Sequence, residues 1–166
     1  MRVLASDPIA RAADVAAAGA DLVELDTLYD GADIITLHAP LLPSTHHMIG
    51  ARELALMKPT AIVINTSRGG LIDEAALVTA LTDGTLAGAA LDVLEAESND
   101  MKDPLSQNRV PLHEVPNLLV TPHIAGQTRE AFQEAGTRSW SEVQAVLAGA
   151  TPAFPVNTND LRKVPA

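Results

Sequence analysis

The stretch Ala61-Ile62-Val63-Ile64-Asn65-Thr66-Ser67-Arg68-Gly69-Gly70 decides the fold class. It begins as a continuous apolar run and changes at once to polar residues and glycine. A second run of the same kind is Asp33-Ile34-Ile35-Thr36-Leu37. Continuous runs of this length are typical of strands that are covered on both faces, as in a parallel sheet. The two stretches therefore predict strands of one parallel sheet.

Helical patterns alternate with such runs along the chain. Pro8 suits a first helical turn, and the alanine-rich residues after it predict a helix to Ala18. Asp73 is a candidate N-cap for a helix that ends near Gly84. The last helix is predicted from residues at helical spacing: Phe132, Gly136, Trp140, Val143 and Leu147. Further strands are expected at 3–5, 21–25, 86–91 and 118–120. This alternation predicts an α/β fold, with a long loop from Glu95 to Pro116.

Composition excludes several classes of protein. The 166 residues include 11 Lys and Arg against 21 Asp and Glu, which gives a formal net charge of −10. That charge disfavours nucleic acid and anionic membranes as partners. Cysteine is absent, so disulfides and thiol chemistry are excluded. The sequence shows neither a transmembrane span nor a signal peptide, and a cytoplasmic protein is the default expectation.

Polar side chains follow the predicted strands directly. In open α/β sheets, ligands bind beyond the carboxyl ends of the strands. The candidates there are Asp7; His38 and Pro40; Asn65 to Gly70; Asp92, with Glu95 and Glu97 beyond it; and Thr121 to His123. Five strand ends that each deliver a polar group predict a site at one edge of the sheet.

Five short motifs carry a resemblance to a known family. They are residues 37–41 (LHAPL), 54–59 (LALMKP), 64–74 (INTSRGGLIDE), 88–93 (GAALDV) and 116–126 (PNLLVTPHIAG). By their order and spacing, the chain resembles the D-isomer-specific 2-hydroxyacid dehydrogenases from about Val3 to Asn157. The resemblance implies a Rossmann-like, doubly wound parallel sheet and an NAD-dependent oxidoreductase that interconverts a D-2-hydroxy acid and its 2-oxo acid.

The same resemblance implies three catalytic residues, Arg68, Glu97 and His123. Arg68 would bind the substrate carboxylate, because a planar guanidinium makes two parallel hydrogen bonds. His123 would exchange the hydroxyl proton as acid and base, and Glu97 would pair with it and fix its tautomer. Without the resemblance, Arg68 would be a solvated loop cation and His123 a structural loop histidine, while Glu95 would compete with Glu97.

The implied cofactor is NAD. Its candidate contacts are Asp7, Pro40, Thr45, Thr66, Ser67, Asp92 and Gly126. Asp7 would bind the adenine ribose diol, and Asp92 the nicotinamide amide. A carboxylate at ~4 Å from a 2′-phosphate would cost on the order of 4 kcal/mol per unit charge at an effective dielectric of about 20, which favours NAD over NADP. Asp7 could instead cap the helix after Pro8, and Arg11 could offset its charge.

The other histidines carry weaker signals. His46 and His47 are adjacent and cannot share one face of a helix or strand, so we interpret them as surface residues rather than metal ligands. His38 is interpreted as structural or cofactor-lining. No metal site is expected.

The usual dinucleotide fingerprint is a glycine-rich turn after the first strand, with an acidic residue about 20 positions later. If Asp7 is that acid, the glycines would precede Met1, and no Gly-x-Gly occurs in the chain. We therefore expect an incomplete sheet that lacks its first βα unit, with a gap between the strands that end at Asp7 and His38. Residues 1–150 are expected to form a partial NAD-binding domain, and 151–166 a connector toward a largely absent substrate domain. A fragment, a late-starting gene model and a natural truncation all explain this pattern.

The expected partners are a small 2-hydroxy or 2-oxo acid and a second copy of the chain in a homo-oligomer, a dimer. The chain alone is expected to bind NAD weakly and to turn over slowly or not at all. Two alternatives stay open: a non-catalytic NAD(H)-binding regulatory or corepressor-like protein, and an inert remnant. The sequence does not choose between glyoxylate, hydroxypyruvate, phosphoglycerate and bulkier acids.

Overall fold

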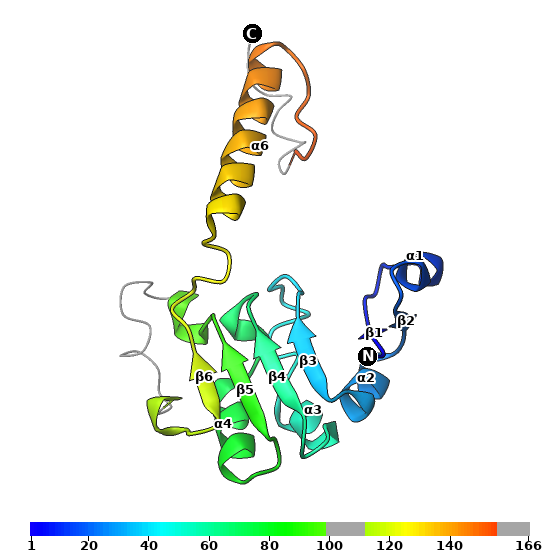
Figure 1. Cartoon of the computed structure of the whole chain (residues 1–166), viewed down its shortest axis with the longest axis vertical. Coiled ribbons are helices and arrows are strands. Elements are labelled where there is room, and N and C mark those ends of the chain that lie inside the picture. The colour runs from blue at the N-terminus through cyan, green and yellow to red at the C-terminus, as the bar shows by residue number, and fades with distance from the viewer. Residues whose placement is uncertain (99–111, 156–166) are drawn as a thin grey trace. The chain divides into compact units, whose positions relative to one another are not determined.

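The chain divides into two compact units, Met1–His123 and Ile124–Ala166. A computed structural model describes residues 1–98 and 112–155 (Figure 1). Each unit is described by itself. Most of the expected long loop and most of the expected connector, residues 99–111 and 156–166, lie outside the described residues.

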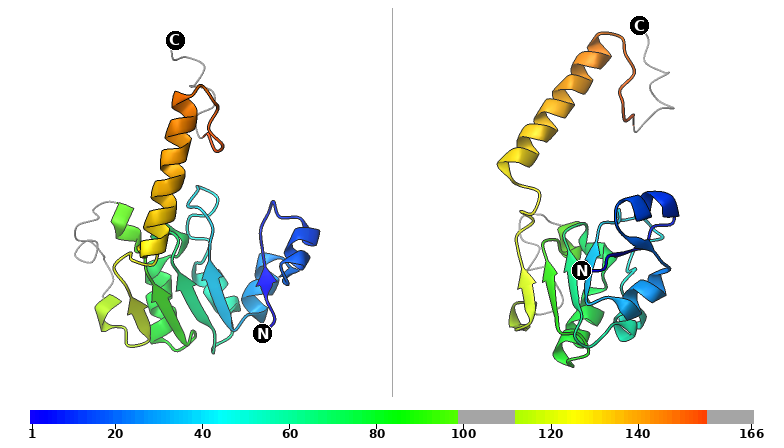
Figure 2. Two further views of the ribbon diagram at one scale, coloured as in Figure 1. Left: turned by 45° about the horizontal axis from the view of Figure 1, so that its top comes forward. Right: turned by 45° about the vertical axis from the view of Figure 1, so that its right-hand side comes forward.

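Four parallel strands form the main sheet of the first unit (Figures 1 and 2). In spatial order they are β3 (Ile34–Leu37), β4 (Ile62–Asn65), β5 (Gly88–Leu91) and β6 (Leu118–Val120). The register aligns the last residues of all four strands in one row: Leu37, Asn65, Leu91 and Val120. The predicted Rossmann-like α/β fold with a parallel sheet is confirmed.

A second, smaller sheet pairs β1 (Leu4–Ala5) with β2 (Asp21–Leu22) in parallel. Among the described residues, neither strand is paired with β3, so the gap expected next to the strand that ends at His38 is observed. The intervening helix α1 (Ala12–Ala17) begins later than the expected Pro8. The reason is a turn in which Asp7 Oδ1 accepts the amide protons of Ile9 at 2.8 Å and Ala10 at 3.1 Å.

The helix expected after Asp73 is confirmed as α4 (Glu74–Thr82). Asp73 Oδ1 caps it by accepting the amide protons of Ala75 and Ala76 at 3.1 Å each. Gly84, at φ +71°, supplies the left-handed residue that ends it. Two further helices, α2 (Leu25–Gly31) and α3 (Ala51–Leu56), lie where the sequence patterns predicted none.

Helices α2, α3 and α4 cover one face of the main sheet (Figures 1 and 2). The buried cluster that joins them to the strands includes Tyr29, Leu54, Leu77, Ile35 and Val63. Alternate strand residues point the other way because side chains in a strand alternate between faces.

On that other face, Ile34, Ile62 and Leu119 are exposed. The expectation that these apolar runs are covered on both faces is therefore not met by the described residues. The strands are apolar on both faces, and one face is packed.

Two 3-10 helices follow strands of the main sheet and shape its carboxyl edge. Gly69–Leu71 follows β4, and Glu95–Ser98 follows β5. A third, Leu112–Glu114, precedes β6.

The second unit contains the long helix α6 (Arg129–Leu147). Thr128 Oγ1 accepts the amide proton of Ala131 at 3.1 Å and caps the helix, which ends before Gly149 as the sequence predicts. None of the helices in the described residues has the length and apolar character that a membrane span requires.

Candidate functional site

The carboxyl ends of four strands meet at one edge of the main sheet. The residues that follow the aligned row are His38, Thr66, Asp92 and Thr121. Because β5 lies between β4 and β6, the ends of β4 and β6 are separated by two strand spacings, about 10 Å in total. Those four residues form a second row beyond the strand ends. Arg68 lies two residues after Thr66, and His123 lies two residues after Thr121. Their loops therefore leave the same edge of the sheet.

The loop that carries Arg68 is held by Asn65, a fully buried side chain. Asn65 Nδ2 donates to the carbonyl of Arg68 at 2.9 Å, and its Oδ1 accepts the amide proton of Ser67 at 3.0 Å. The Ser67 hydroxyl donates to the carbonyl of Leu37 at 2.6 Å and ties this loop to the end of β3. The Arg68 side chain is exposed, and its Nη1 donates to the carbonyl of Ser67 at 2.7 Å. Asn65 thus positions the Arg68 loop, a role that its residue type and place in the sequence did not indicate.

Glu97 and His123 form a hydrogen-bonded pair. Glu97 Oε2 lies 2.8 Å from His123 Nδ1, and Glu97 Oε1 accepts the amide proton of Leu94 at 2.9 Å. His123 has a left-handed backbone, φ +52°, which is uncommon outside glycine. Its amide donates to the carbonyl of Thr121 at 3.0 Å, which closes a tight turn over Pro122. This backbone turns the imidazole toward the largely buried Glu97 carboxylate.

Asp92 is a buried carboxylate at the end of β5. The Thr121 hydroxyl donates to its Oδ1, and its amide donates to the carbonyl of Asn65 at 2.9 Å. Asp92 therefore links the ends of three adjacent strands. It lies directly after the last residue of β5, as predicted from the sequence.

The remaining expected cofactor contacts lie in turns. The Thr45 hydroxyl donates to the carbonyl of Pro40 at 2.6 Å and accepts the amide proton of Leu42 at 2.8 Å, so it closes its own loop. Thr66 is exposed after β4. Gly126 belongs to the second unit and lies in a turn where the amide of Gln127 donates to the carbonyl of Ile124 at 2.9 Å.

Asp7 is exposed after β1, and its carboxylate closes a turn with the amides of Ile9 and Ala10; it does not cap a helix, because α1 begins only at Ala12. Arg11 is engaged by Asp14 through two bonds, 2.7 Å from Nε and 2.8 Å from Nη2. The guanidinium that could offset the charge of Asp7 is thus held by another carboxylate.

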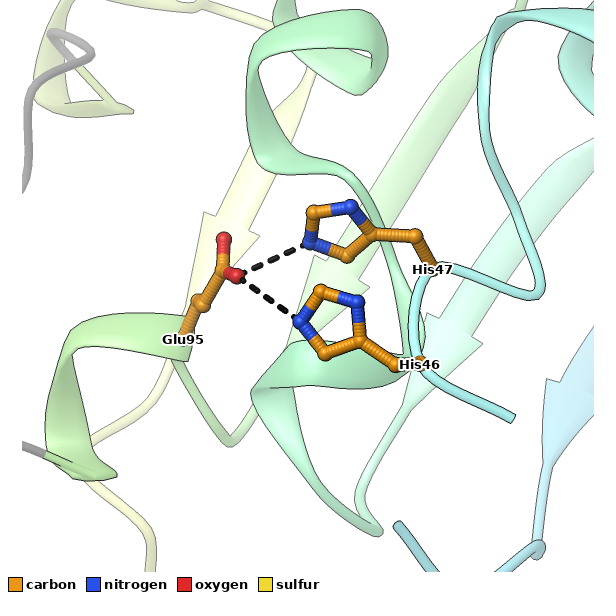
Figure 3. A group of neighbouring side chains, drawn as sticks. All are labelled: His46, His47 and Glu95. Atoms are coloured by element: carbon orange, nitrogen blue, oxygen red, sulfur yellow. Dashed lines mark hydrogen bonds and ion pairs between the residues drawn. The ribbon is translucent and has the colours of Figure 1, made fainter. Parts of the chain in front are cut away.

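His46 and His47, interpreted from sequence as surface residues, point their rings toward the same carboxylate (Figure 3). Their rings stack with centroids 3.9 Å apart, and both Nε2 atoms face Glu95 Oε1, at 3.6 Å for His46 and 2.8 Å for His47. Adjacent residues cannot share one face of a regular helix or strand, but these two histidines lie in a turn. His47 lies in a turn with φ +51°, which brings both rings to one side.

The chain matches the family model described as "D-isomer specific 2-hydroxyacid dehydrogenase, NAD binding domain" over residues 1–125. It is 48% identical over 128 residues to a glycerate dehydrogenase of Methylorubrum extorquens, covering 77% of this chain and 39% of that protein. It is 42% identical over 145 residues to a glyoxylate reductase of Thermofilum pendens, covering 87% of this chain and 41% of the relative.

A solved structure with a similar fold is the NAD complexed form of a D-isomer specific 2-hydroxyacid dehydrogenase from Lactobacillus delbrueckii ssp. bulgaricus. It superposes with a TM-score of 0.82 at 33% identity, over 92% of this chain and 47% of that one. The chain spans less than half the length of each of these relatives. Because the family model matches three quarters of its residues, the chain belongs to the D-isomer specific 2-hydroxyacid dehydrogenase family, through the NAD binding domain of that family.

Proposed function

We propose that this chain supplies the cofactor-binding and proton-transferring part of an NAD-dependent oxidoreductase that interconverts a D-2-hydroxy acid and its 2-oxo acid. The observation that carries the proposal is the 2.8 Å bond between His123 and Glu97. Arg68 lies in a loop at the same edge of the sheet. An acid–base histidine, its orienting carboxylate and a carboxylate-binding guanidinium are the groups this reaction requires.

The residues present fit NAD in part. Asp7 offers a carboxylate to the ribose diol, and buried Asp92 offers an oxygen to the nicotinamide amide. Exposed Thr66 lies in the same strand-end row as Asp92. The pyrophosphate would need a glycine-rich turn, and no Gly-x-Gly occurs in the 166 residues. When bound, NAD accepts a hydride from the substrate carbon, or NADH returns it.

The side chains of the chain supply the proton transfer. Nδ1 of His123 lies 2.8 Å from Glu97 Oε2, and the carboxylate stabilises the tautomer that carries the ring proton on Nδ1, in which Nε2 is the basic nitrogen of the ring. In oxidation, Nε2 takes the hydroxyl proton as the carbonyl forms, and in reduction it returns that proton to the new hydroxyl. Arg68 binds the substrate carboxylate through two parallel hydrogen bonds.

Asp7 supports NAD rather than NADP. Its carboxylate would repel a 2′-phosphate, and Arg11, the neighbouring cation, is already paired with Asp14. The relatives suggest a small substrate, because they include a glycerate dehydrogenase and a glyoxylate reductase.

Self-association and location are also proposals. Exposed Ile34, Ile62 and Leu119 on one face of the sheet support a homo-oligomer, in which a dimer is the simplest form. Sedimentation equilibrium tests it, and a single monomer species would overturn it. A cytoplasmic location stays a prediction from sequence.

The test of the function is a direct assay of the protein, expressed from its gene in the natural length. NADH oxidation is followed with glyoxylate, hydroxypyruvate and pyruvate, and at least one acid should be reduced. Bound NADH without turnover of any acid in a wide panel would favour the regulatory alternative. Absence of both binding and turnover would favour an inert remnant.

Arg68→Lys tests in the same assay whether the guanidinium binds the substrate carboxylate. Lysine keeps the positive charge but loses the planar fork, so kcat/KM should fall by about 10- to 100-fold, the effect of one charged hydrogen bond. An unchanged kcat/KM would remove Arg68 from the proposed site.

A further inference from the structure

Three side chains outside the proposed catalytic residues point their ligand atoms toward one another (Figure 3). His46, His47 and Glu95 each offer one ligand atom, and these three atoms all lie within 4.8 Å of one another. We propose that they bind a divalent transition-metal ion, Zn²⁺ or a metal of similar chemistry. This proposal does not depend on the proposed function.

The spacing of the three atoms is close to what such an ion needs. Zn²⁺ binds imidazole nitrogen at about 2.0–2.1 Å, which places two ligands of a tetrahedral site about 3.3 Å apart. His46 Nε2 and Glu95 Oε1 are 3.6 Å apart. His47 Nε2 and Glu95 Oε1, at 2.8 Å, would separate by about 0.5 Å when the ion replaces the proton between them. Rotation of the side chains is enough for this change.

The backbone of both ligand-bearing segments is fixed by one turn, Gly69–Gly70. The amide of His47 donates to the carbonyl of Gly70 at 2.8 Å. On the other side, a Cβ at Gly69 would overlap the backbone of Leu94 and Glu95, so only glycine allows this close approach. The two histidines and the glutamate are therefore held against each other before any ion binds.

Glu95 is also fixed from its own backbone. Its amide donates to Oε1 of the buried Glu74 at 2.7 Å. This bond leaves the Glu95 side chain directed at the histidine rings (Figure 3).

The ligand set favours a metal of the zinc group. Two imidazole nitrogens and one carboxylate oxygen suit Zn²⁺, Co²⁺ or Ni²⁺, whereas Ca²⁺ and Mg²⁺ prefer oxygen ligands alone. All three side chains are partly exposed, which leaves room for water as a fourth ligand. A competing explanation is a simple His47–Glu95 ion pair that binds no metal.

The experiment titrates Zn²⁺ into the chelator-treated protein by calorimetry and records the visible spectrum with Co²⁺. One ion per chain is expected, with the d–d bands of a nitrogen- and oxygen-ligated Co²⁺. Each of His46→Ala, His47→Gly and Glu95→Gln should weaken binding by at least about 10-fold. Glycine suits the left-handed backbone of His47, so this variant removes the ring without strain.

Two matched controls come from the neighbouring histidine–glutamate pair. Glu97→Gln and His123→Asn should keep the Zn²⁺ affinity, because neither side chain belongs to the trio. Loss of binding in these two variants, with binding retained in E95Q, would place the ion elsewhere and overturn the proposal. Absence of saturable binding to the unmodified protein would also overturn it, in favour of the ion pair. Thermal unfolding of each variant is compared, and if E95Q unfolds early, H46A and H47G provide the readout.

Discussion

Two histidine–glutamate pairs share one 3-10 helix, Glu95–Ser98, and differ in what surrounds them. His47 and His123 both have left-handed backbones, at φ +51° and +52°. Each lies 2.8 Å from its glutamate, Glu95 for His47 and Glu97 for His123. The local chemistry is thus nearly the same in both pairs.

The surroundings separate their roles. The Glu97 side chain is 13% exposed, and its second oxygen accepts the amide proton of Leu94. The Glu95 side chain is 40% exposed, and one of its oxygens faces two imidazole rings. A single buried acceptor fixes one tautomer of one ring, which suits proton transfer. An exposed acceptor shared by two rings leaves space for an ion. We therefore propose different roles for the two pairs, because they differ in burial and in the number of partners.

The largest expected effect comes from His123→Asn. Asparagine tolerates the left-handed backbone, so the change removes the imidazole without adding strain. Loss of the acid–base group should lower kcat by about 10²- to 10⁴-fold. His47→Asn is the matched variant. The factor by which it lowers kcat should be at least about 10 times smaller than the factor for His123→Asn. Equal effects of the two variants in steady-state NADH oxidation would contradict the distinction between the pairs.

Glu97→Gln should have the next largest effect. The glutamine carbonyl can still accept the amide proton of Leu94, but its amide would donate to Nδ1 of His123 and leave the ring proton on Nε2. A neutral ring in that tautomer cannot take the hydroxyl proton, so kcat should fall about 100-fold or more. Nitrogen NMR of the imidazole checks the tautomer. If Glu95→Gln lowers kcat more than Glu97→Gln, the proposed pairing is wrong.

Gly69→Ala should damage both pairs at once. The added Cβ overlaps the backbone of Leu94 and Glu95, so the 3-10 helix that carries both glutamates must move. Overpacking of this kind costs about 1–3 kcal/mol of unfolding free energy. Urea unfolding measures it, and Zn²⁺ affinity and turnover should fall together. Gly136→Ala is the opposite control, since an open helical position should gain about 0.5–1 kcal/mol.

The main sheet could be predicted because its strands are short apolar runs with clear ends. The strand predicted at 118–120 matches β6, and the cap predicted at Asp73 is observed. Helices α2 and α3 could not be predicted in this way. Each is a helix of six or seven residues, too short to form from propensity alone, and it is stabilised by packing, for example of Tyr29 in the core.

The candidate site shows the same limit. The resemblance to the family selected Glu97 over Glu95, while residue types alone could not, because both lie in one turn two residues apart. The convergence of His46 and His47 depends on a left-handed histidine, and nothing in the residue types around it marks that backbone. Asn65 could be identified from the sequence as a polar residue at the end of a strand. That it fixes the loop of Arg68 follows only from its buried hydrogen bonds in the structure.

The smallest expected effect, from Tyr29→Phe, acts on one pair only. The Tyr29 hydroxyl donates to the carbonyl of Met48 at 3.1 Å, directly after His47. Removing the hydroxyl should cost about 1 kcal/mol of unfolding free energy near neutral pH and weaken Zn²⁺ binding slightly, while the contacts of His123 stay unchanged.

Burial raises the pKa of Tyr29 to about 12, above its value of about 10 in an unfolded chain. A raised pKa means that the folded state favours the protonated hydroxyl, so this contribution is complete below about pH 10 and is lost as pH rises toward 12. The stability difference between the two proteins should therefore shrink over that range in urea unfolding. Tyr29 is the single tyrosine of the chain, so ultraviolet titration of tyrosinate reports on it alone, and a midpoint near 10 in the folded protein would contradict the argument.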